Sequence, residues 1–222
     1  MTFPDAAAPP RPPSGVTDPK EVHIIPDGEH AGHTFIGARQ AGARFTHAVY
    51  EGCVFRDCVL TEANFSNARF VDCSFVGCEL SMLVVAGASV VQSRFVDCRA
   101  MGIQWSSAHA ATFSASFERC KLDSGVFSGM KLKGVSMVAC RLDGADLTGC
   151  DLNGACFTDS DLGGAKLRHA DLRGADFAEA RGFVFDPRTN RAGKTKINLE
   201  TAAQVLASLG LVVPDLDTIL GR

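Results

Sequence analysis

The stretch DLTGCDLNGACFTDSDLGGAKLRHADLRGADF, residues 146–177, carries a leucine or phenylalanine at every fifth position. An α-helix turns by about 100° per residue, so a five-residue step would scatter these side chains around the helix axis. A β-strand reverses its side-chain direction at each residue, so the same step would divide them between two faces. The pattern therefore indicates short extended segments joined by regular corners. The apolar positions are Leu147, Leu152, Phe157, Leu162, Leu167, Leu172 and Phe177.

Each five-residue unit has the same internal order around this apolar residue, which we call the centre. A small residue lies two positions before the centre and a residue that is mostly charged lies between them, as in Cys150, Asp151 and Leu152. The two residues after the centre are turn formers, as in Asn153-Gly154, and glycine suits the positive φ of a type II turn. The small residue and the centre therefore share an inward face, and the residue between them points outward.

A second period of 20 residues is superimposed on the first, with a single step of 22 after Phe95. Four five-residue sides make one coil, and stacked coils place equivalent centres in internal ladders. The sequence thus predicts an all-β solenoid of about seven coils over residues 23–182. A Pro/Ala-rich segment, 1–22, has the composition of a disordered tail, and residues 183–222 follow as a connector, a capping helix and a tail. The main ladder comprises Phe35, Phe55, Phe75, Phe95, Phe117, Met137, Phe157 and Phe177.

Composition limits the function classes. The formal net charge is −3, which argues against a basic face that grips nucleic acid directly. No run of 18 apolar residues is present, so no membrane span is expected, and residues 1–19 have neither the basic nor the apolar region of a secretory signal. We expect a cytoplasmic protein.

Nine cysteines and six histidines raise the question of a metal site. Eight cysteines occupy the small inward position that alanine fills elsewhere, so we interpret them as small buried hydrophobes and Cys156 as a surface thiol. His30 and His33 near Glu29 are a weak metal candidate, and we interpret them instead as part of an N-terminal cap. A filled interior leaves no substrate pocket and no catalytic motif is present, so we expect neither a cofactor nor an enzyme.

The 22-residue step places two extra residues within 106–116, directly after Trp105. This segment is either a tolerated insertion or a contact loop on a rigid rod. An irregular stretch at 81–91, SMLVVAGASVV, is interpreted as a locally repacked wall. The candidate contact residues of the loop are Ser106, Ser107, His109, Thr112 and Phe113.

The C-terminal region predicts a helix, NLETAAQVLASLG, with Asn198 as the N-cap and Gly210 just past its end. An open solenoid end exposes core and unpaired strand edges, so this helix either caps its own rod or joins two copies. We favour a homodimer because apolar residues are in excess of what one cap needs. The predicted dimer residues are Leu199, Ala202, Ala203, Leu206, Leu209, Leu211 and Val213.

Carboxylates are a further surface feature, and residues 30–180 as a whole carry 16 acidic and 14 basic residues. Residues 142–165 contain five aspartates and neither lysine nor arginine, a local density that approaches that of DNA. The alternative is an ordinary solvated face. The candidate acidic patch comprises Asp143, Asp146, Asp151, Asp159, Asp161, Asp171 and Asp176.

Over residues 30–180 the repeat resembles the pentapeptide-repeat family, which implies a right-handed quadrilateral β-helix. The segments CELSMLVVAGASVVQSRFVDCRAMGIQWSS, FERCKL and TAAQVLASLGLVV resemble the branch that protects DNA gyrase, which includes albicidin-resistance, microcin B17 immunity and Qnr quinolone-resistance proteins. That resemblance implies a DNA-like dimeric rod that binds DNA gyrase or topoisomerase IV and relieves poisoning by antibiotics. The acidic patch would then face the enzyme. The alternative function is an interaction scaffold for another partner.

Overall fold

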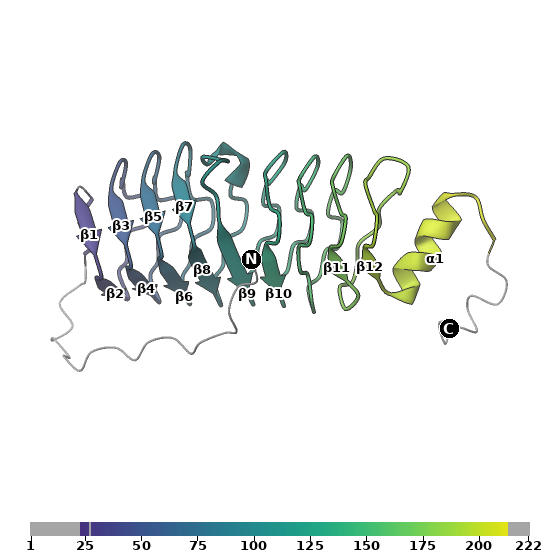
Figure 1. The fold of residues 1–222 in the computed structure, drawn as a ribbon. Coiled ribbons are helices and arrows are strands. Elements are labelled where there is room, and N and C mark those ends of the chain that lie inside the picture. Colours follow the sequence, from purple (N-terminus) through teal and green to yellow (C-terminus); the bar gives the residue numbers. More distant parts are fainter. Residues whose placement is uncertain (1–22, 27, 213–222) are drawn as a thin grey trace.

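In the computed structural model, which describes residues 23–26 and 28–212, the chain forms a β-solenoid of about eight turns. Parallel strands stack along the rod, and a single helix closes its C-terminal end (Figure 1). The solenoid predicted from the five-residue period and the terminal helix predicted from its capping residues are both confirmed. The number of turns is one more than predicted, because β12 adds a partial coil beyond residue 182.

Each coil has four walls, which we number in chain order. The first wall is a sheet of four strands: β1 (Glu29–Ala31), β3 (Val49–Glu51), β5 (Arg69–Val71) and β7 (Ser89–Val91). The second wall is a sheet of six strands: β2 (Thr34–Ile36), β4 (Val54–Arg56), β6 (Ser74–Val76), β8 (Ser93–Val96), β9 (Ala115–Glu118) and β10 (Ser136–Val138). The same wall ends with the pair β11 (Asp176–Phe177) and β12 (Lys196–Ile197).

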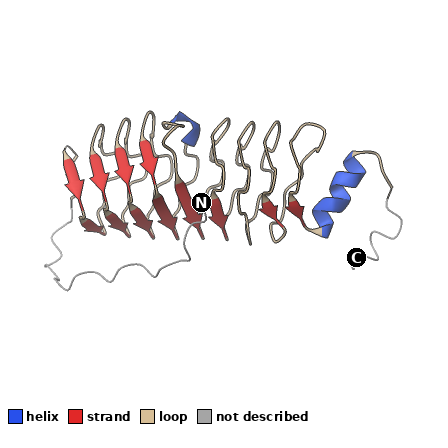
Figure 2. Cartoon of the chain, in the orientation of Figure 1, coloured by secondary structure: helices blue, strands red, loops and turns tan. Residues whose placement is uncertain are grey.

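The third and fourth walls are held by single parallel bridges rather than by strands, which is why they are drawn as loops in Figure 2. The third wall runs from Arg39 to Arg181, and the fourth begins at Arg44 and ends at Lys166. Two outward residues flank each inward centre. The sides are too short to form long strands because each five-residue unit has only about three extended residues before the next corner.

The 20-residue period of the sequence corresponds to the pairing register of neighbouring coils, in which residues 20 positions apart lie opposite each other. Phe55 is paired with both Phe35 and Phe75, and its ring stacks on Phe75 at a centroid distance of 4.6 Å. Phe75 stacks on Phe95 at 4.7 Å. Neighbouring coils thus bury each other's aromatic rings, which is the main source of cohesion along the rod.

The single 22-residue step appears where β8 pairs with β9, with Ser93 opposite Ala115. The N–H of His109 still donates to the carbonyl of Ala88 at 2.9 Å, which is the ordinary ladder position. The two extra residues therefore lie between His109 and Ala115. A short 3-10 helix, η1 (Trp105–Ser107), leads into this loop.

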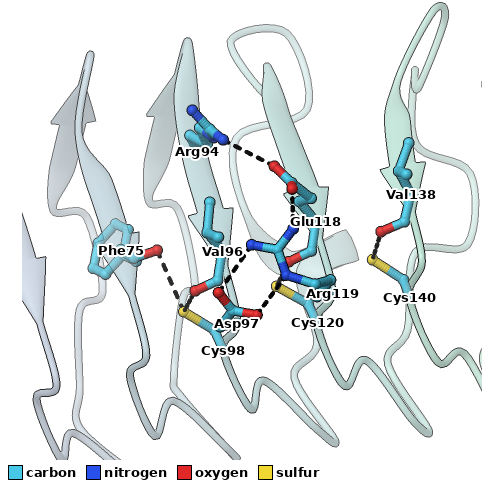
Figure 3. Close-up of polar contacts among 10 residues, drawn as sticks. All are labelled: Phe75, Arg94, Val96, Asp97, Cys98, Glu118, Arg119, Cys120, Val138 and Cys140. Carbon is cyan, nitrogen blue, oxygen red and sulfur yellow. Dashed lines mark hydrogen bonds and ion pairs between the residues drawn. The ribbon is translucent and has the colours of Figure 1, made fainter. Parts of the chain in front are cut away.

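The cysteines line the core, as expected: eight are buried and Cys156 is partly exposed. Their thiols donate to main-chain carbonyls, and Figure 3 shows Cys98 with the carbonyls of Phe75 and Val96 at 3.4 and 3.3 Å. Burial raises the pKa of Cys73 and of Cys150 to about 12, so both stay protonated. Outside the core, Figure 3 shows ion pairs between coils, such as Arg94 with Glu118.

The helix α1 (Leu199–Ser208) begins where predicted, with the side chain of Asn198 accepting from the N–H of Thr201 at 2.8 Å. The other end of the Asn198 amide donates to the carbonyl of Ala180 at 2.6 Å and so ties the helix to the last coil. Ala203 is buried against the rod. No helix in the described residues is long and apolar enough to cross a membrane.

Candidate protein-binding surfaces

The inward side chains fill the solenoid, so any binding must use its exterior. At the N-terminal end, His30 is buried and stacks on Tyr50 at 5.0 Å, which agrees with a capping role. Within residues 23–26 and 28–212, no group of three histidine, cysteine or acidic side chains is placed to hold a metal ion.

The seven aspartates of the predicted acidic patch do not share one face. The bridges place Asp176 on the second wall, Asp161 on the third, Asp146 on the fourth and Asp151 on the first. The reason is geometric: successive five-residue units belong to successive walls, so a run that is dense in sequence is distributed around the rod. The prediction of a single patch was wrong in this respect.

Five of these aspartates cap turns. The side chain of Asp146 accepts from the N–H of Thr148 at 2.9 Å, and Asp151 accepts from that of Asn153 at 3.1 Å. This N–H, one residue past the centre, takes no part in the ladder, so the carboxylate satisfies it. Asp161, Asp171 and Asp176 make the same contact.

Ion pairs neutralise part of the remaining acidity. Arg173 lies 2.6 Å from Asp171 and holds the pKa of that carboxyl at about 2. Lys196 lies 2.7 Å from Asp176 and lowers its pKa in the same way. These two aspartates therefore present little free negative charge.

Two aspartates converge at the C-terminal part of the third wall, and Asp159 lies at the corner before it. We call Asp143, Asp159 and Asp161 the third-wall cluster. Oxygens of Asp143 and Asp161 lie 3.2 and 3.4 Å from the position that a Cβ at Gly163 would take, so the two carboxylates converge there. Asp159 is exposed at the corner that leads into this wall. Sequence reasoning named these residues but not their separation from the other four.

The same wall also carries basic residues. Arg141 pairs with Asp123 at 2.5 Å, and this contact, with smaller contributions from Asp143 and Asp161, raises the pKa of the guanidinium. Arg181 lies 3.4 Å from Asp161. The cluster is therefore acidic only locally, and the outward column of its wall is mainly basic, with five basic and two acidic residues. That column comprises Arg39, Val59, Glu79, Arg99, Lys121, Arg141, Asp161 and Arg181.

The loop 106–116 is anchored rather than loose. The carbonyl of Ser107 accepts from the N–H of Gly87 at 2.8 Å, and the hydroxyl of Thr112 bonds to that of Ser89 at 3.2 Å. Ser107 and His109 are exposed, and Ser106 and Thr112 are half-buried.

Phe113 differs from the other predicted contact residues because its side chain is buried and packs edge-on against Trp105 at 5.7 Å. It therefore belongs to the core. The alternation of Phe113, Ala115 and Phe117 is the sequence signal that could have shown this, since all three point inward.

In the coil before the loop lies an apolar area that the sequence analysis interpreted only as a repacked wall. Met82 and Val84 are 55% and 44% exposed. Met82 has a positive φ of 60°, and its sulfur lies over Gly102, 2.5 Å from where a Cβ at that position would be. We call Met82, Val84, Ser107 and His109 the loop surface.

Large apolar side chains are also exposed at the first residue of the terminal helix and directly after its end. Leu199, Leu209 and Leu211 are 54%, 40% and 54% exposed, whereas Ala202 and Leu206 are half-buried. Ala203, the remaining predicted dimer residue with described placement, faces its own rod. The helix thus caps its own solenoid and leaves an apolar exterior. Val213 lies outside the described residues.

A parallel solenoid with four short walls per coil and inward phenylalanine and leucine ladders defines a repeat protein built from five-residue units. The family model described as "Pentapeptide repeat region" matches residues 48–114 and 110–181, and the chain belongs to the pentapeptide-repeat family.

Among solved structures, a trypsin-treated form of QnrB1, a plasmid-mediated fluoroquinolone resistance protein, is similar with a TM-score of 0.59 and 21% identity. The similarity covers 83% of this chain and 97% of that one. HetL from the cyanobacterium Nostoc sp. strain PCC 7120, a pentapeptide-repeat protein involved in regulating heterocyst differentiation, has a TM-score of 0.49 and 18% identity over 77% of this chain and 83% of its own. No curated protein sequence matches the chain.

Proposed function

We propose that this protein is a non-enzymatic cytoplasmic partner of a bacterial type II topoisomerase, DNA gyrase or topoisomerase IV. Binding would protect that enzyme from topoisomerase-poisoning antibiotics of the albicidin or quinolone type. The observation that carries the proposal is a rod with a filled interior whose fold extends over 97% of a QnrB1 chain, a fluoroquinolone resistance protein. Such a rod has no interior space for a substrate and offers only its exterior, which favours action by binding.

The proposed contacts are the third-wall cluster and the loop surface. The cluster would meet basic enzyme surface, where exposed carboxylates increase the rate of encounter and select the orientation. The loop surface would add the apolar contact that holds the complex, because exposed apolar area removed from water contributes about 25 cal/mol per Å² before the costs of association. In this proposal DNA mimicry is confined to one part of one wall.

The apolar outer side of α1 would pair two copies end to end. Two rods joined in this way would place two third-wall clusters near the middle of the dimer, since each cluster lies in the C-terminal coils. We propose this homodimer as the form that binds the enzyme, and we propose no direct contact with nucleic acid or membrane.

The test is DNA gyrase supercoiling in the presence of albicidin or a fluoroquinolone, with and without this protein. We expect micromolar protein to restore supercoiling in the presence of one of these drugs. Neither rescue nor inhibition at that concentration would remove the topoisomerase hypothesis.

Matched variants separate the electrostatic part. Asp143→Asn, Asp159→Asn and Asp161→Asn together remove the cluster, whereas Asp151→Asn, Asp171→Asn and Asp176→Asn remove three aspartates from the other walls. Asparagine keeps the turn cap, as the contact from the N–H of Ser66 to the Asn64 side chain at 2.9 Å shows. Only the first triple variant should weaken rescue, and equal effects of both would contradict a local acidic contact.

A scaffold for a different partner is the second candidate. The mixed, mainly basic charges of the third wall and the exposed Met82 and Val84 favour it, because charged and apolar surface together are typical of protein interfaces generally. The supercoiling assay distinguishes the two, since a scaffold of this kind would leave gyrase unaffected.

A further inference from the structure

The fourth wall is shorter than its neighbours by one coil. On the third wall Asp161 is bridged to Arg181, and on the first wall Asp171 is bridged to Arg191. On the fourth wall the ladder stops at Lys166, which is bridged only to the preceding coil. The residue that should be the next centre, 20 positions after Leu167, is Pro187. Proline has no N–H to donate to a ladder, and the chain leaves the wall here.

This gap leaves main-chain groups without partners. One coil earlier, the N–H of Leu147 donates to the carbonyl of Lys166 at 3.0 Å, and that of Gly149 donates to the carbonyl of Arg168 at 2.8 Å. The equivalent N–H groups of Leu167 and His169 have no acceptor among the described residues. An unpaired edge of this kind is a template for an added strand.

Only one side of the gap is closed by a side chain. The amide of Asn190, which is buried, accepts from the N–H of Ala170 at 2.9 Å and donates to the carbonyl of Leu167 at 3.0 Å. Asn190 thus replaces the missing backbone at the following corner. The straight part of the wall stays open.

The open part is a cavity of about 500 Å³ with one basic and one apolar side. The basic side is lined by Lys166, Arg168 and His169, and the apolar side is lined by Val184 and Phe185. Lys166 and Arg168 make no ion pair with any residue in the described part of the chain. Asp186, the acidic residue of the lining, is already engaged by Arg188 at 2.8 Å, which lowers its pKa.

The chain carries a segment of matching chemistry directly after α1. Ser208, the last residue of the helix, lines the cavity itself, and residues 213–222 read VPDLDTILGR. Within them, Pro-Asp-Leu-Asp-Thr, 214–218, has the order of one repeat unit: a small residue, an aspartate, an apolar centre and two turn formers. It is similar to the units SDLGG at 160–164 and CDLNG at 150–154.

We propose that residues 214–218 fill the gap in the fourth wall as a displaced repeat unit of the same chain. Main-chain carbonyls of the segment would accept from the N–H groups of Leu167 and His169. Asp215 and Asp217 would lie against the basic side of the cavity, and Leu216 would cover Phe185. Extended chain advances about 3.3 Å per residue, so the few residues between Ser208 and Pro214 suffice to reach a cavity that Ser208 already borders.

Amide hydrogen exchange followed by NMR tests the proposal in the full chain. We expect the amides of Leu167 and His169 to exchange at least about tenfold more slowly than in a chain that ends at Val212, because the added strand must open before exchange. The amides of Leu147 and Gly149 are the internal control and should not differ. Equal exchange of Leu167 and His169 in both chains would overturn the proposal.

Charge variants and dilution complete the test. Asp215→Lys with Asp217→Lys in the full chain should behave like the shortened chain, whereas Thr218→Ala should retain the protection. Arg168→Glu should lose protection and Lys133→Glu, on the first wall, should retain it. Protection that stays constant over about a hundredfold range of protein concentration supports the intrachain contact. Protection that falls on dilution would overturn it and assign the segment to a second copy.

Discussion

Replacing one ring of the phenylalanine ladder tests the idea that each coil is stabilised by its neighbours. Phe55 is fully buried and stacks between Phe35 at 5.1 Å and Phe75 at 4.6 Å, with Tyr50 packed edge-on at 5.3 Å. Phe55→Ala removes both stacks and leaves a cavity that rigid walls cannot close. We expect a loss of about 4 kcal/mol, within the usual range for a buried phenylalanine.

Phe35→Ala is the matched control because Phe35 belongs to the same ladder but lies at the N-terminal end of the rod. Its ring has only one phenylalanine neighbour in the ladder, it is 6% exposed, and the end coil can relax around the change. We expect a loss of about 2 kcal/mol.

Urea unfolding followed by circular dichroism measures the loss for both variants, and hydrogen exchange locates it. In Phe55→Ala the amides of the coils before β4 should lose protection first, while those near β10 should exchange as in the wild type. Equal losses in the two variants, or loosening spread evenly along the rod, would refute a nearest-neighbour account.

Three further outcomes follow from the structure. Gly182→Ala should destabilise by at least about 1 kcal/mol more than Gly154→Ala in urea unfolding: both glycines have positive φ, but only at Gly182 would a Cβ come within 3.0 Å of backbone, that of Gly163. The pKa of Asp171 in the folded chain, about 2, is below its unfolded value of about 3.9. Its contribution to the free energy of unfolding is therefore present above pH ~4 and is lost as the pH falls toward 2. Asp171→Asn should remove this part of the pH dependence of stability, and an unchanged acid unfolding profile would contradict the ion pair with Arg173. The double variant Leu199→Glu with Leu209→Glu should convert a dimer to a monomer, as measured by analytical sedimentation. Gln204→Glu, at an exposed position on the same helix, should leave the dimer intact. A double variant that stays dimeric would exclude the outer side of α1 as the interface.

The fold was predictable because a five-residue period allows few structures. The small and large inward positions, the 20-residue register and the 22-residue step all correspond to contacts in the rod, as Ser93 opposite Ala115 shows. Asn198 was predictable as an N-cap because capping is local chemistry.

The surfaces were less predictable because they depend on which wall a residue occupies. Aspartates that are close in sequence are separated around the rod. Position modulo 20 is the signal that would have assigned Asp143, which aligns with Gly163, and Asp161, which aligns with Arg141, to the same wall. The Met82 side chain lies over Gly102 in the adjacent coil, a contact between residues 20 positions apart. The gap in the fourth wall could have been suspected from Pro187 at a centre position.

Direct binding of this protein to purified DNA gyrase tests the central claim most directly. Biolayer interferometry at low ionic strength should show saturable binding at micromolar concentration. Binding should weaken with added salt and with substitution of Asp143, Asp159 and Asp161 by asparagine, because part of the contact is electrostatic. Absence of binding at tens of micromolar of correctly folded protein, for both gyrase and topoisomerase IV, would contradict the account.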